Sequence, residues 1–313
     1  MSFSADVKNE ITRLDEDKKC CMLAEIAGLI RMCGIVGKNV NNEYELKIIT
    51  ENPAIARLYL KRIKKYFGVG ARLNIGQSNV LKKNRFYELE IGAESNVGRI
   101  LTETGMLETK ENGDSLPDGI PFDIIKDRCC KKAFLRGAFL GAGTISHPEK
   151  SYHMEIVCRN ETLSDNIKRL INSFGMSSKV TLRRKNYVVY LKESEQISDF
   201  LALLGASKHV MELENIKIVK ELRNKTNRIV NCESANLDKT INSAARQIET
   251  IRFIQSETGL DNLPDRLKEI ALLRLDHPES SLTELGQMLQ PQLKKSGVNH
   301  RFRKIEEIAD KLR

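Results

Sequence analysis

The chain carries the stretch Ile26-Ala-Gly-Leu-Ile-Arg-Met-Cys-Gly34 and, 109 residues later, the related stretch Leu135-Arg-Gly-Ala-Phe-Leu-Gly-Ala-Gly143. Both are apolar and share two glycines at equivalent positions, Gly28 with Gly34 and Gly137 with Gly143. Small residues on one helix face allow a second backbone to approach closely. We therefore predict that residues 20–33 and 129–142 form two helices packed together along a pseudo-twofold axis. The alternative is that the glycines are ordinary small core residues.

The similarity extends outward from these stretches on both sides. Matching segments are Cys20-Cys21 with Cys129-Cys130, Tyr44–Ile48 with Tyr152–Ile156, and Phe67-Gly68 with Phe174-Gly175. The offset between matching residues falls from 109 to 107, as deletions in loops would produce. A repeat of this length indicates a domain built from two similar halves.

Each half has the same predicted order of elements. After the glycine-containing helix we expect a strand, a helix ended by glycine, two strands joined by a turn, and a last helix. In the first half these are residues 44–50, 53–67, 71–76 with 85–91, and about 95–104. In the second half they are residues 152–158, 161–174, 178–183 with 187–192, and 194–204. The sequence therefore predicts an α+β domain of two α-β-α-β-β-α units.

The composition predicts a cytoplasmic protein of about two domains. The chain has 313 residues, a formal net charge of +9 and a pI of about 9.1, which favours a polyanionic partner. It has no apolar run long enough to span a membrane, and the start MSFSADVKNEI does not resemble a signal peptide. The seven cysteines form no Cys-x-x-Cys pair, and adjacent cysteines make poor chelates. We expect reduced, buried thiols, no metal site and no cofactor.

Basic residues are concentrated in equivalent parts of the two halves. Residues 52–87 carry nine Lys or Arg and residues 166–192 carry seven, and neither segment has an acidic residue. The strand-joining turns are the most basic parts, with Lys82, Lys83, Arg85, Arg183, Arg184 and Lys185. We expect these side chains to contact DNA phosphates. The alternatives are turns that only raise solubility, or a surface that binds a protein.

Residues 207–262 are predicted to be a helical connector between the repeat domain and the C-terminal segment. Its amide-rich stretch offers Arg228 and Asn231 as candidate contacts to nucleic acid. Asparagines of this kind also serve in helix caps and turns, and we favour that structural role.

The last 50 residues have the pattern of three short helices. We expect helices at about 264–275 and 282–289, the second capped by Ser280 or Ser281, and a final helix capped by Ser296 that runs to about Leu312. Its buried stripe is predicted to be Phe302, Ile305, Ala309 and Leu312. The polar residues on and before its other face suit a helix-turn-helix recognition helix, although an ordinary helical bundle has a similar pattern. The candidate DNA-binding residues are Ser281, Thr283, Lys294, Lys295, Ser296, Asn299, His300, Arg301, Arg303 and Lys304.

The two glycine-containing stretches resemble the motif helices of monomeric LAGLIDADG homing endonucleases. Those enzymes carry an acidic residue directly before the final glycine of each motif, and the two carboxylates hold divalent metals at the DNA. The matching positions here are Cys33 and Ala142. Neither supplies the hard oxygen ligand that Mg²⁺ prefers. The resemblance therefore implies the fold, with no catalytic residues and no nuclease activity.

The whole chain resembles the WhiA family of Gram-positive bacteria. The resemblance rests on the degenerate motif helices, on the stretch Asn227-Arg-Ile-Val-Asn-Cys-Glu-Ser-Ala-Asn-Leu237, and on Lys295-Ser-Gly-Val-Asn-His-Arg301. It implies a LAGLIDADG-like two-repeat domain followed by an all-α helix-turn-helix domain. The expected boundaries are an N-terminal segment at 1–19, the repeat domain at 20–206, the connector at 207–262 and the helix-turn-helix domain at 263–313.

The same resemblance implies a function. The family's members are transcription regulators linked to cell division, chromosome segregation and, in some bacteria, sporulation. The expected partner is double-stranded DNA in the nucleoid, with RNA polymerase or a WhiB-type iron–sulfur protein as a further partner. The alternative is an architectural or protein-docking factor of the nucleoid or division machinery with little sequence specificity.

Overall fold

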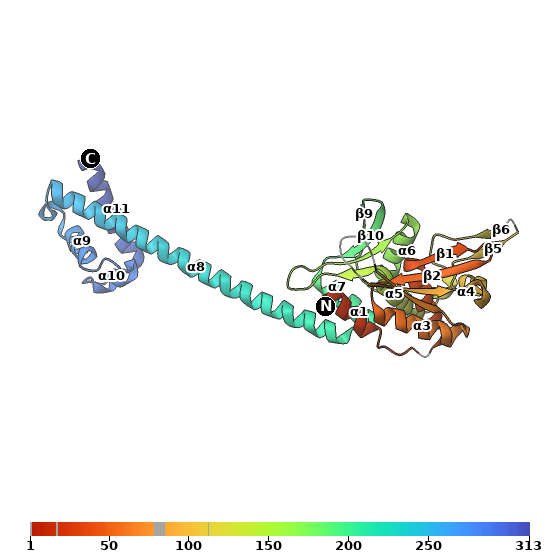
Figure 1. The fold of residues 1–313 in the computed structure, drawn as a ribbon. Coiled ribbons are helices and arrows are strands. Elements are labelled where there is room, and N and C mark those ends of the chain that lie inside the picture. Colours follow the sequence, from red (N-terminus) through yellow and green to blue (C-terminus); the bar gives the residue numbers. More distant parts are fainter. Residues whose placement is uncertain (1, 17, 78–84, 112) are drawn as a thin grey trace. The chain divides into compact units, whose positions relative to one another are not determined.

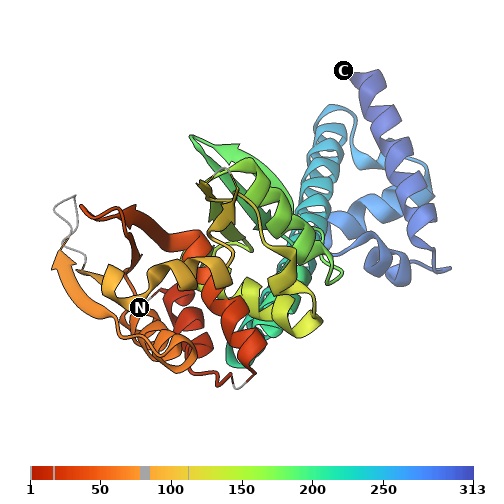
Figure 2. The same cartoon turned by 90° about the vertical axis from the view of Figure 1, so that its right-hand side faces the viewer.

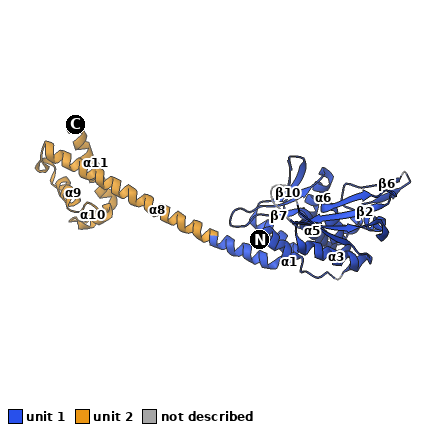
Figure 3. Cartoon of the chain, viewed as in Figure 1, with its two compact units in different colours: residues 1–219 blue, residues 220–313 orange. Residues whose placement is uncertain are grey.

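The computed structural model describes residues 2–16, 18–77, 85–111 and 113–313 (Figure 1). The chain divides into two compact units, Met1–Val219 and Lys220–Arg313 (Figure 3). Each unit has its own apolar core, the first built from helices and sheets and the second from helices.

Two 15-residue helices, α2 (Lys19–Cys33) and α5 (Arg128–Ala142), form the centre of the first unit. A Cβ atom at Gly28 would lie 2.3 Å from the carbonyl oxygen of Phe134, and one at Gly137 would lie 2.0 Å from that of Glu25. Each glycine thus meets the backbone of the other helix, and the relation is reciprocal. The prediction of two motif helices packed about a pseudo-twofold axis is confirmed.

Each motif helix leads into a four-stranded antiparallel sheet, as far as the described residues show. The first sheet has the order β1-β2-β4-β3 and the second the order β7-β8-β10-β9. The first half contains β1 (Gly34–Lys38), β2 (Tyr44–Thr50), α3 (Pro53–Phe67), β3 (Arg72–Gln77), β4 (Arg85–Ile91) and α4 (Val97–Glu103). The second contains β7 (Gly143–Ile145), β8 (Met154–Cys158), α6 (Glu161–Asn172), β9 (Lys179–Arg183), β10 (Asn186–Leu191) and α7 (Ser194–Leu204).

The predicted α-β-α-β-β-α unit is wrong in one respect, because each half has an additional strand directly after its motif helix. Strand β1 has the sequence GIVGK, and β7 has only three residues. Neither shows the alternation of apolar and polar residues by which strands are recognised. Both are held by pairing with the following strand, Gly34 with Ile48 and Gly143 with Ile156.

Local signals explain the helices beneath the sheets. Asn52 caps α3 by accepting a hydrogen bond from the backbone nitrogen of Ala54 at 2.8 Å, and Pro53 follows in the first turn. Gly68 ends α3 in a left-handed conformation with φ 75°. Asn160 caps α6 in the same way, through the nitrogen of Leu163. The apolar faces of α3 and α6 then cover one side of each sheet.

The N-terminal segment is also structured. Residues Phe3–Ile11 form helix α1, capped by Ser2. Its buried side chains Phe3, Val7 and Ile11 recur every four residues and therefore lie on one face, which packs into the core of the first unit. The remaining elements of this unit are the hairpin β5 (Glu108–Lys110) and β6 (Gly113–Ser115), and the 3-10 turns η1 (Ala93–Ser95) and η2 (Phe122–Ile125).

Helix α8 (Ser207–Glu257) begins among residues of the first unit and ends in the second. The other elements of the second unit are η3 (Leu260–Asn262), α9 (Asp265–Asp276), α10 (Leu282–Met288) and α11 (Lys295–Leu312). Helix α11 packs on α9 and α10 (Figure 2). Ile251 and Ile254 of α8 lie in the same core, so the last turns of the predicted connector are part of this packed unit.

Among the described residues, none of the helices combines the length and the apolar character that crossing a membrane requires.

Candidate nucleic-acid interface

A tight turn fixes the angle between α10 and α11. A Cβ atom at Gly286 would lie 2.2 Å from the carbonyl oxygen of Leu293, and the Leu293 nitrogen donates a hydrogen bond to the Gly286 oxygen at 2.9 Å. Glycine is therefore required where the incoming chain crosses α10. Two helices joined in this manner form the frame of a helix-turn-helix.

Helix α10 begins with a capping box. The Ser281 hydroxyl accepts a hydrogen bond from the Glu284 nitrogen at 3.3 Å, and the Ser281 nitrogen donates to a Glu284 carboxylate oxygen at 2.7 Å. The hydrogen bond from the Ser281 nitrogen to this carboxylate, and a smaller effect of the Ser281 side chain, lower the pKa of Glu284. Of the two caps that the sequence left open, Ser280 and Ser281, the structure has Ser281. The neighbouring Thr283 is exposed.

The buried stripe of α11 is formed by Val298, Phe302, Ile305 and Ala309. The predicted stripe placed Leu312 in this set and left out Val298. Leu312 is 38% exposed because it lies in the last turn, beyond the core. The stripe thus lies one turn nearer the N-terminus of the helix than predicted, toward α10.

The opposite face of the N-terminal half of α11 is polar and basic. Lys294, Lys295, Ser296, His300, Arg303 and Lys304 are exposed, and Asn299 is partly exposed. The predicted cap at Ser296 is wrong, because the N-cap is Lys294 and makes no side-chain capping hydrogen bond. Acidic residues appear only further along, at Glu306, Glu307 and Asp310. The positive charges thus add to the positive end of the helix dipole.

Arg301 is placed differently from the other candidate residues. Its guanidinium donates to the Arg266 carbonyl at 3.0 Å and pairs with Glu269 at 3.1 Å, and its side chain is only 15% exposed. Both partners lie on α9. Arg301 therefore joins α11 to α9, and its neighbours His300 and Arg303 face solvent.

Sequence reasoning missed a buried arginine in this unit. Arg274 of α9 is 1% exposed and donates to the Gln247 side chain at 3.1 Å and to the Ser280 carbonyl. Its guanidinium also lies 5.6 Å from the ring centre of Phe302. Burial lowers its pKa. The helical spacing in the sequence could have indicated this burial, because Arg274 lies on the same helix face as the apolar residues Leu267, Ile270 and Ala271.

The open faces of the two sheets are less basic than the sequence suggested. Lys47 pairs with Glu90 at 3.3 Å, and Asn74 donates to both Glu88 and Glu90. In the second sheet Glu155 pairs with Arg183 at 3.2 Å. On each sheet, therefore, one of the basic side chains is paired with a carboxylate.

The basic turns are only partly described. Lys82 and Lys83 lie outside the described residues. Arg85 is exposed at the start of β4. In the second turn Arg184 has a φ of 58°, and it and Lys185 are exposed.

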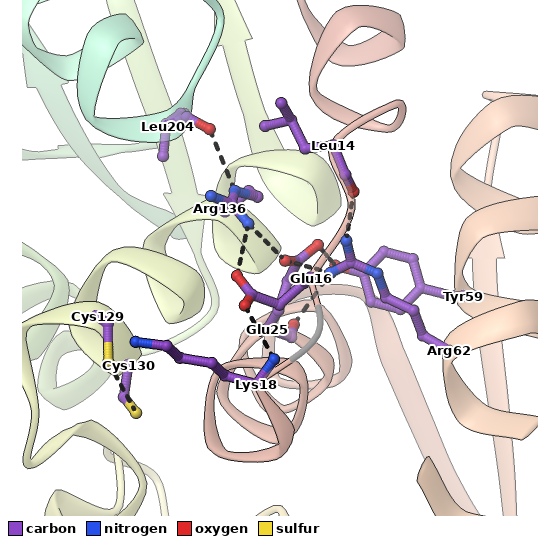
Figure 4. A network of polar contacts seen from close by, with 10 residues as sticks. All are labelled: Leu14, Glu16, Lys18, Glu25, Tyr59, Arg62, Cys129, Cys130, Arg136 and Leu204. Atoms are coloured by element: carbon purple, nitrogen blue, oxygen red, sulfur yellow. Dashed lines mark hydrogen bonds and ion pairs between the residues drawn. The ribbon is translucent and has the colours of Figure 1, made fainter. Parts of the chain in front are cut away.

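One basic residue counted from the sequence is inside the protein. Arg62 of α3 forms an ion pair with Glu25 of α2, which is fully buried (Figure 4). Arg136 of α5 reaches the same Glu25 at 3.2 Å and Glu16 at 3.4 Å. Tyr59 adds a hydrogen bond to Glu25 at 3.4 Å. This cluster ties α2, α3 and α5 together and removes Arg62 from the basic surface.

Arg228 and Asn231 lie on α8 and are exposed. The amide-rich stretch around them was expected to serve in caps and turns, and that interpretation is wrong, because α8 continues through it without a break.

The ends of the motif helices carry no carboxylate at the positions that match the endonuclease acids. The Cys33 thiol donates to the Leu29 carbonyl at 3.3 Å, and burial raises its pKa to about 12. Ala142 has no ligand atom. A partly buried, neutral thiol is a poor ligand for Mg²⁺, which requires oxygen donors.

The paired motif helices, the two sheets and the α9–α11 unit define a class of protein in which a degenerate LAGLIDADG-like domain is joined to a helix-turn-helix domain. Family descriptions match in the same order: "WhiA N-terminal LAGLIDADG-like domain" at residues 19–107, "WhiA LAGLIDADG-like domain" at 131–223 and "WhiA C-terminal HTH domain" at 226–309. The chain belongs to the WhiA family, which confirms the resemblance seen in the sequence.

Relatives match over the full length. Proteins named "Probable cell division protein WhiA" from Clostridium acetobutylicum and Alkaliphilus metalliredigens are 47% and 45% identical, over 100% of this chain and 99% of each relative. The crystal structure of full-length DUF199/WhiA from "Thermatoga maritima" is 25% identical, with a TM-score of 0.59 over 99% of both chains. The predicted fold class is confirmed by these matches.

Proposed function

We propose that this protein is a sequence-specific, DNA-binding transcription regulator that acts in cell division and has no nuclease activity. The observation that carries the proposal is the exposed basic face of the N-terminal half of α11, held at a fixed angle to α10. Relatives named as cell division proteins supply the process. Chromosome segregation, sporulation in some bacteria, and association with the nucleoid belong to the same proposal.

In the proposed complex α11 lies in the major groove with its N-terminal residues toward the bases. Asn299, His300 and Arg303 are the base-reading candidates, since amide, imidazole and guanidinium groups match base edges. Lys294, Lys295, Ser296 and Lys304, with Ser281 and Thr283 of α10, are the phosphate contacts. Arg301 is a positioning residue, because its guanidinium already binds α9.

The repeat domain has a different proposed role. Its open sheet faces hold Glu88, Glu90 and Glu155 in contact with the basic side chains, which disfavours a close approach by phosphates. This observation favours docking of a protein, such as RNA polymerase or a WhiB-type partner, and it supports the second candidate function of an architectural or docking factor. Phosphate contacts from Arg85, Arg184 and Lys185 of the basic turns, and from Arg228 and Asn231 of α8, are secondary proposals.

Capture of sheared genomic DNA by the purified full-length protein near physiological salt, followed by sequencing, tests the proposal. Discrete peaks with a common short motif support a regulator. Even coverage that disappears with added salt supports the architectural function instead.

Single-residue variants then identify which residues of α11 contact the bases. Arg303→Ala should weaken binding to the recovered motif about 5- to 150-fold and binding to random DNA much less, because a base contact is worth roughly 1–3 kcal/mol. Lys311→Ala is the matched control, since Lys311 is an exposed cation near the other end of the same helix. Equal losses from the two variants would exclude α11 as the reading helix.

A further inference from the structure

Four cysteines from the two halves of the repeat domain meet at one place. Cys20 and Cys21 lie in the first turn of α2, and Cys129 and Cys130 lie in the first turn of α5. Their four Sγ atoms all lie within 4.8 Å of one another, with 4.0 Å between Cys129 and Cys130 (Figure 4 shows this second pair). The packing of α2 on α5 thus brings together thiols that are 109 residues apart in the sequence.

We propose that these four cysteines bind one zinc ion in a tetrahedral tetrathiolate site. Zinc–sulfur bonds of about 2.3 Å place the sulfur atoms of such a site about 3.8 Å apart. The observed spacing requires each sulfur atom to move by less than about 1 Å toward a common centre, which a side-chain torsion supplies. Soft thiolate ligands in this number and shape select zinc over the oxygen-preferring Mg²⁺ and Ca²⁺.

The charges around the cluster suit a site of this kind. Four thiolates and one zinc ion carry a net charge of −2, so the surroundings must be positive. The cluster lies at the N-terminal ends of α2 and α5, where the helix dipoles are positive and no side chain caps either helix. In the sequence, residues 16–19 and 126–132 around the two pairs carry six cations and three carboxylates: Lys18, Lys19, Lys126, Arg128, Lys131 and Lys132 against Glu16, Asp17 and Asp127.

The site also has an entry path and a protected interior. Cys20 is exposed and Cys129 is partly exposed, whereas Cys21 and Cys130 are buried. A metal ion can therefore arrive from solvent and be bound on the inner side by thiols that water does not reach. Such a site would cross-link the N-terminal ends of the two motif helices. Cys33 and Ala142 lie at the opposite, C-terminal ends.

No metal site is expected from the sequence, because each Cys-Cys pair alone is a poor chelate. The structure, however, brings the two pairs together. The pseudo-twofold axis relates the two pairs, so each pair supplies half of a four-ligand set. Inspection of local spacing does not find such a site, because its ligands come together only when α2 packs on α5.

The test measures the metal content of the full-length protein by elemental mass spectrometry. The protein is purified under reducing conditions without a chelator. We expect one zinc per chain. The single variant Cys20→Ser, which changes an exposed residue, and the double variant Cys21→Ser with Cys130→Ser should reduce the content to less than one tenth. Cys232→Ser, at an exposed cysteine of α8, should retain one zinc and serves as the control.

A second readout does not depend on the variants. Exchange of the bound metal for Co²⁺ should produce the intense charge-transfer bands of tetrahedral cobalt thiolate in the parent protein and in Cys232→Ser. The proposal is overturned if the reduced protein holds no zinc and Co²⁺ gives no such bands. It is also overturned if Cys21 and Cys129, or Cys20 and Cys130, are recovered as disulfides from protein that was never exposed to a chelator, since this result would assign the cluster to thiol oxidation.

Discussion

The residue type and helix position of Arg301 suggest a DNA contact, but its side chain binds another helix of the protein. It stands between the exposed His300 and Arg303, yet its guanidinium points to α9. We expect Arg301→Ala to reduce the free energy of unfolding of the second unit by about 1–2 kcal/mol, because it removes two charge-assisted hydrogen bonds that are partly exposed. Urea denaturation measures this change.

The same variant also tests whether Arg301 positions α11 or contacts a base directly. Arg301→Ala should weaken binding to the recognised motif and to random DNA by the same factor, because α11 is held less firmly in both complexes. Arg303→Ala should act mainly on the recognised motif. Fluorescence anisotropy with both DNAs makes the comparison, and a loss confined to the motif in Arg301→Ala would show that Arg301 itself reads a base.

Arg274 stabilises the second unit through hydrogen bonds in its interior. Arg274→Met keeps most of the side-chain volume but leaves the Ser280 carbonyl and the Gln247 amide without their donor. We expect a loss of about 1–3 kcal/mol in the free energy of unfolding, since buried acceptors without a donor are costly. Arg266→Met, at an exposed residue of the same helix, is the control and should leave stability nearly unchanged. A neutral result for Arg274→Met would mean that water replaces the lost donors.

At the scale of elements, the interface between α2 and α5 depends on glycine. An added methyl group in Gly137→Ala would lie 2.0 Å from the Glu25 carbonyl and 2.9 Å from the Leu29 nitrogen, and these backbone atoms can move only if the helices separate. We expect a loss of about 3 kcal/mol in the free energy of unfolding of the first unit, from overpacking.

Gly98→Ala is the matched control for this prediction. Gly98 lies in α4, and no other described part of the chain comes within 4 Å of its added Cβ. Alanine should therefore leave stability unchanged or raise it by about 0.5–1 kcal/mol, through its better helix propensity. The midpoints of thermal unfolding of the two variants are compared. Similar midpoints would contradict close packing of α2 on α5.

The capping box of α10 makes one contribution to stability depend on pH. Hydrogen bonds from Ser281 lower the pKa of Glu284 below its ordinary value of 4.5, so the folded state favours the carboxylate. This stabilisation is present above pH 4.5 and is lost as the pH falls through the lowered pKa. Glu284→Gln should therefore be less stable than the parent near pH 7 and equal to it in acid.

Thermal unfolding at a series of pH values provides the measurement. Glu279→Gln, which removes an exposed carboxylate before α10, is the control for the loss of one negative charge. A stability difference between Glu284→Gln and the parent that stays constant down to pH 3 would argue against the cap.

The elements show what the sequence could predict. The repeated helices, the strands of the hairpins and the cap at Ser281 follow from periodicity and from local turn chemistry. Strands β1 and β7 follow from neither, because they are too short to show a period and depend on pairing with β2 and β8. The start of α11 was also missed, since it is set by the tight contact of Leu293 with Gly286 and not by a side-chain cap.

At the scale of the whole molecule, the repeat in the sequence predicted the paired halves of the first unit, but it could not predict which charges remain exposed. Nine cations were counted in residues 52–87, and the structure buries Arg62 and pairs Arg72 with Glu94. The four-cysteine cluster was missed for a related reason. Both features depend on segments that are distant in sequence and meet only in the folded chain.

The balance of charge between the two units leads to a prediction about salt. Each phosphate contact contributes about −0.9 to the slope of log affinity against log salt concentration. Replacement of Lys294, Lys295 and Lys304 by alanine should make the slope for random duplex DNA shallower by about 3. The equivalent triple replacement of Arg183, Arg184 and Lys185 should change it by about 2 at most, because Arg183 is already paired with Glu155 and only two of the three side chains remain for phosphates.

Anisotropy titrations of the full-length protein over a range of salt concentrations compare the two triple variants directly. Both remove three basic residues, so net charge alone would change the two slopes equally. A larger change from the α11 variant assigns the phosphate contacts to the helix-turn-helix domain and leaves the sheets of the repeat domain for a protein partner. Equal changes would place DNA on the repeat domain as well, and would favour an architectural protein that holds duplex DNA with both units.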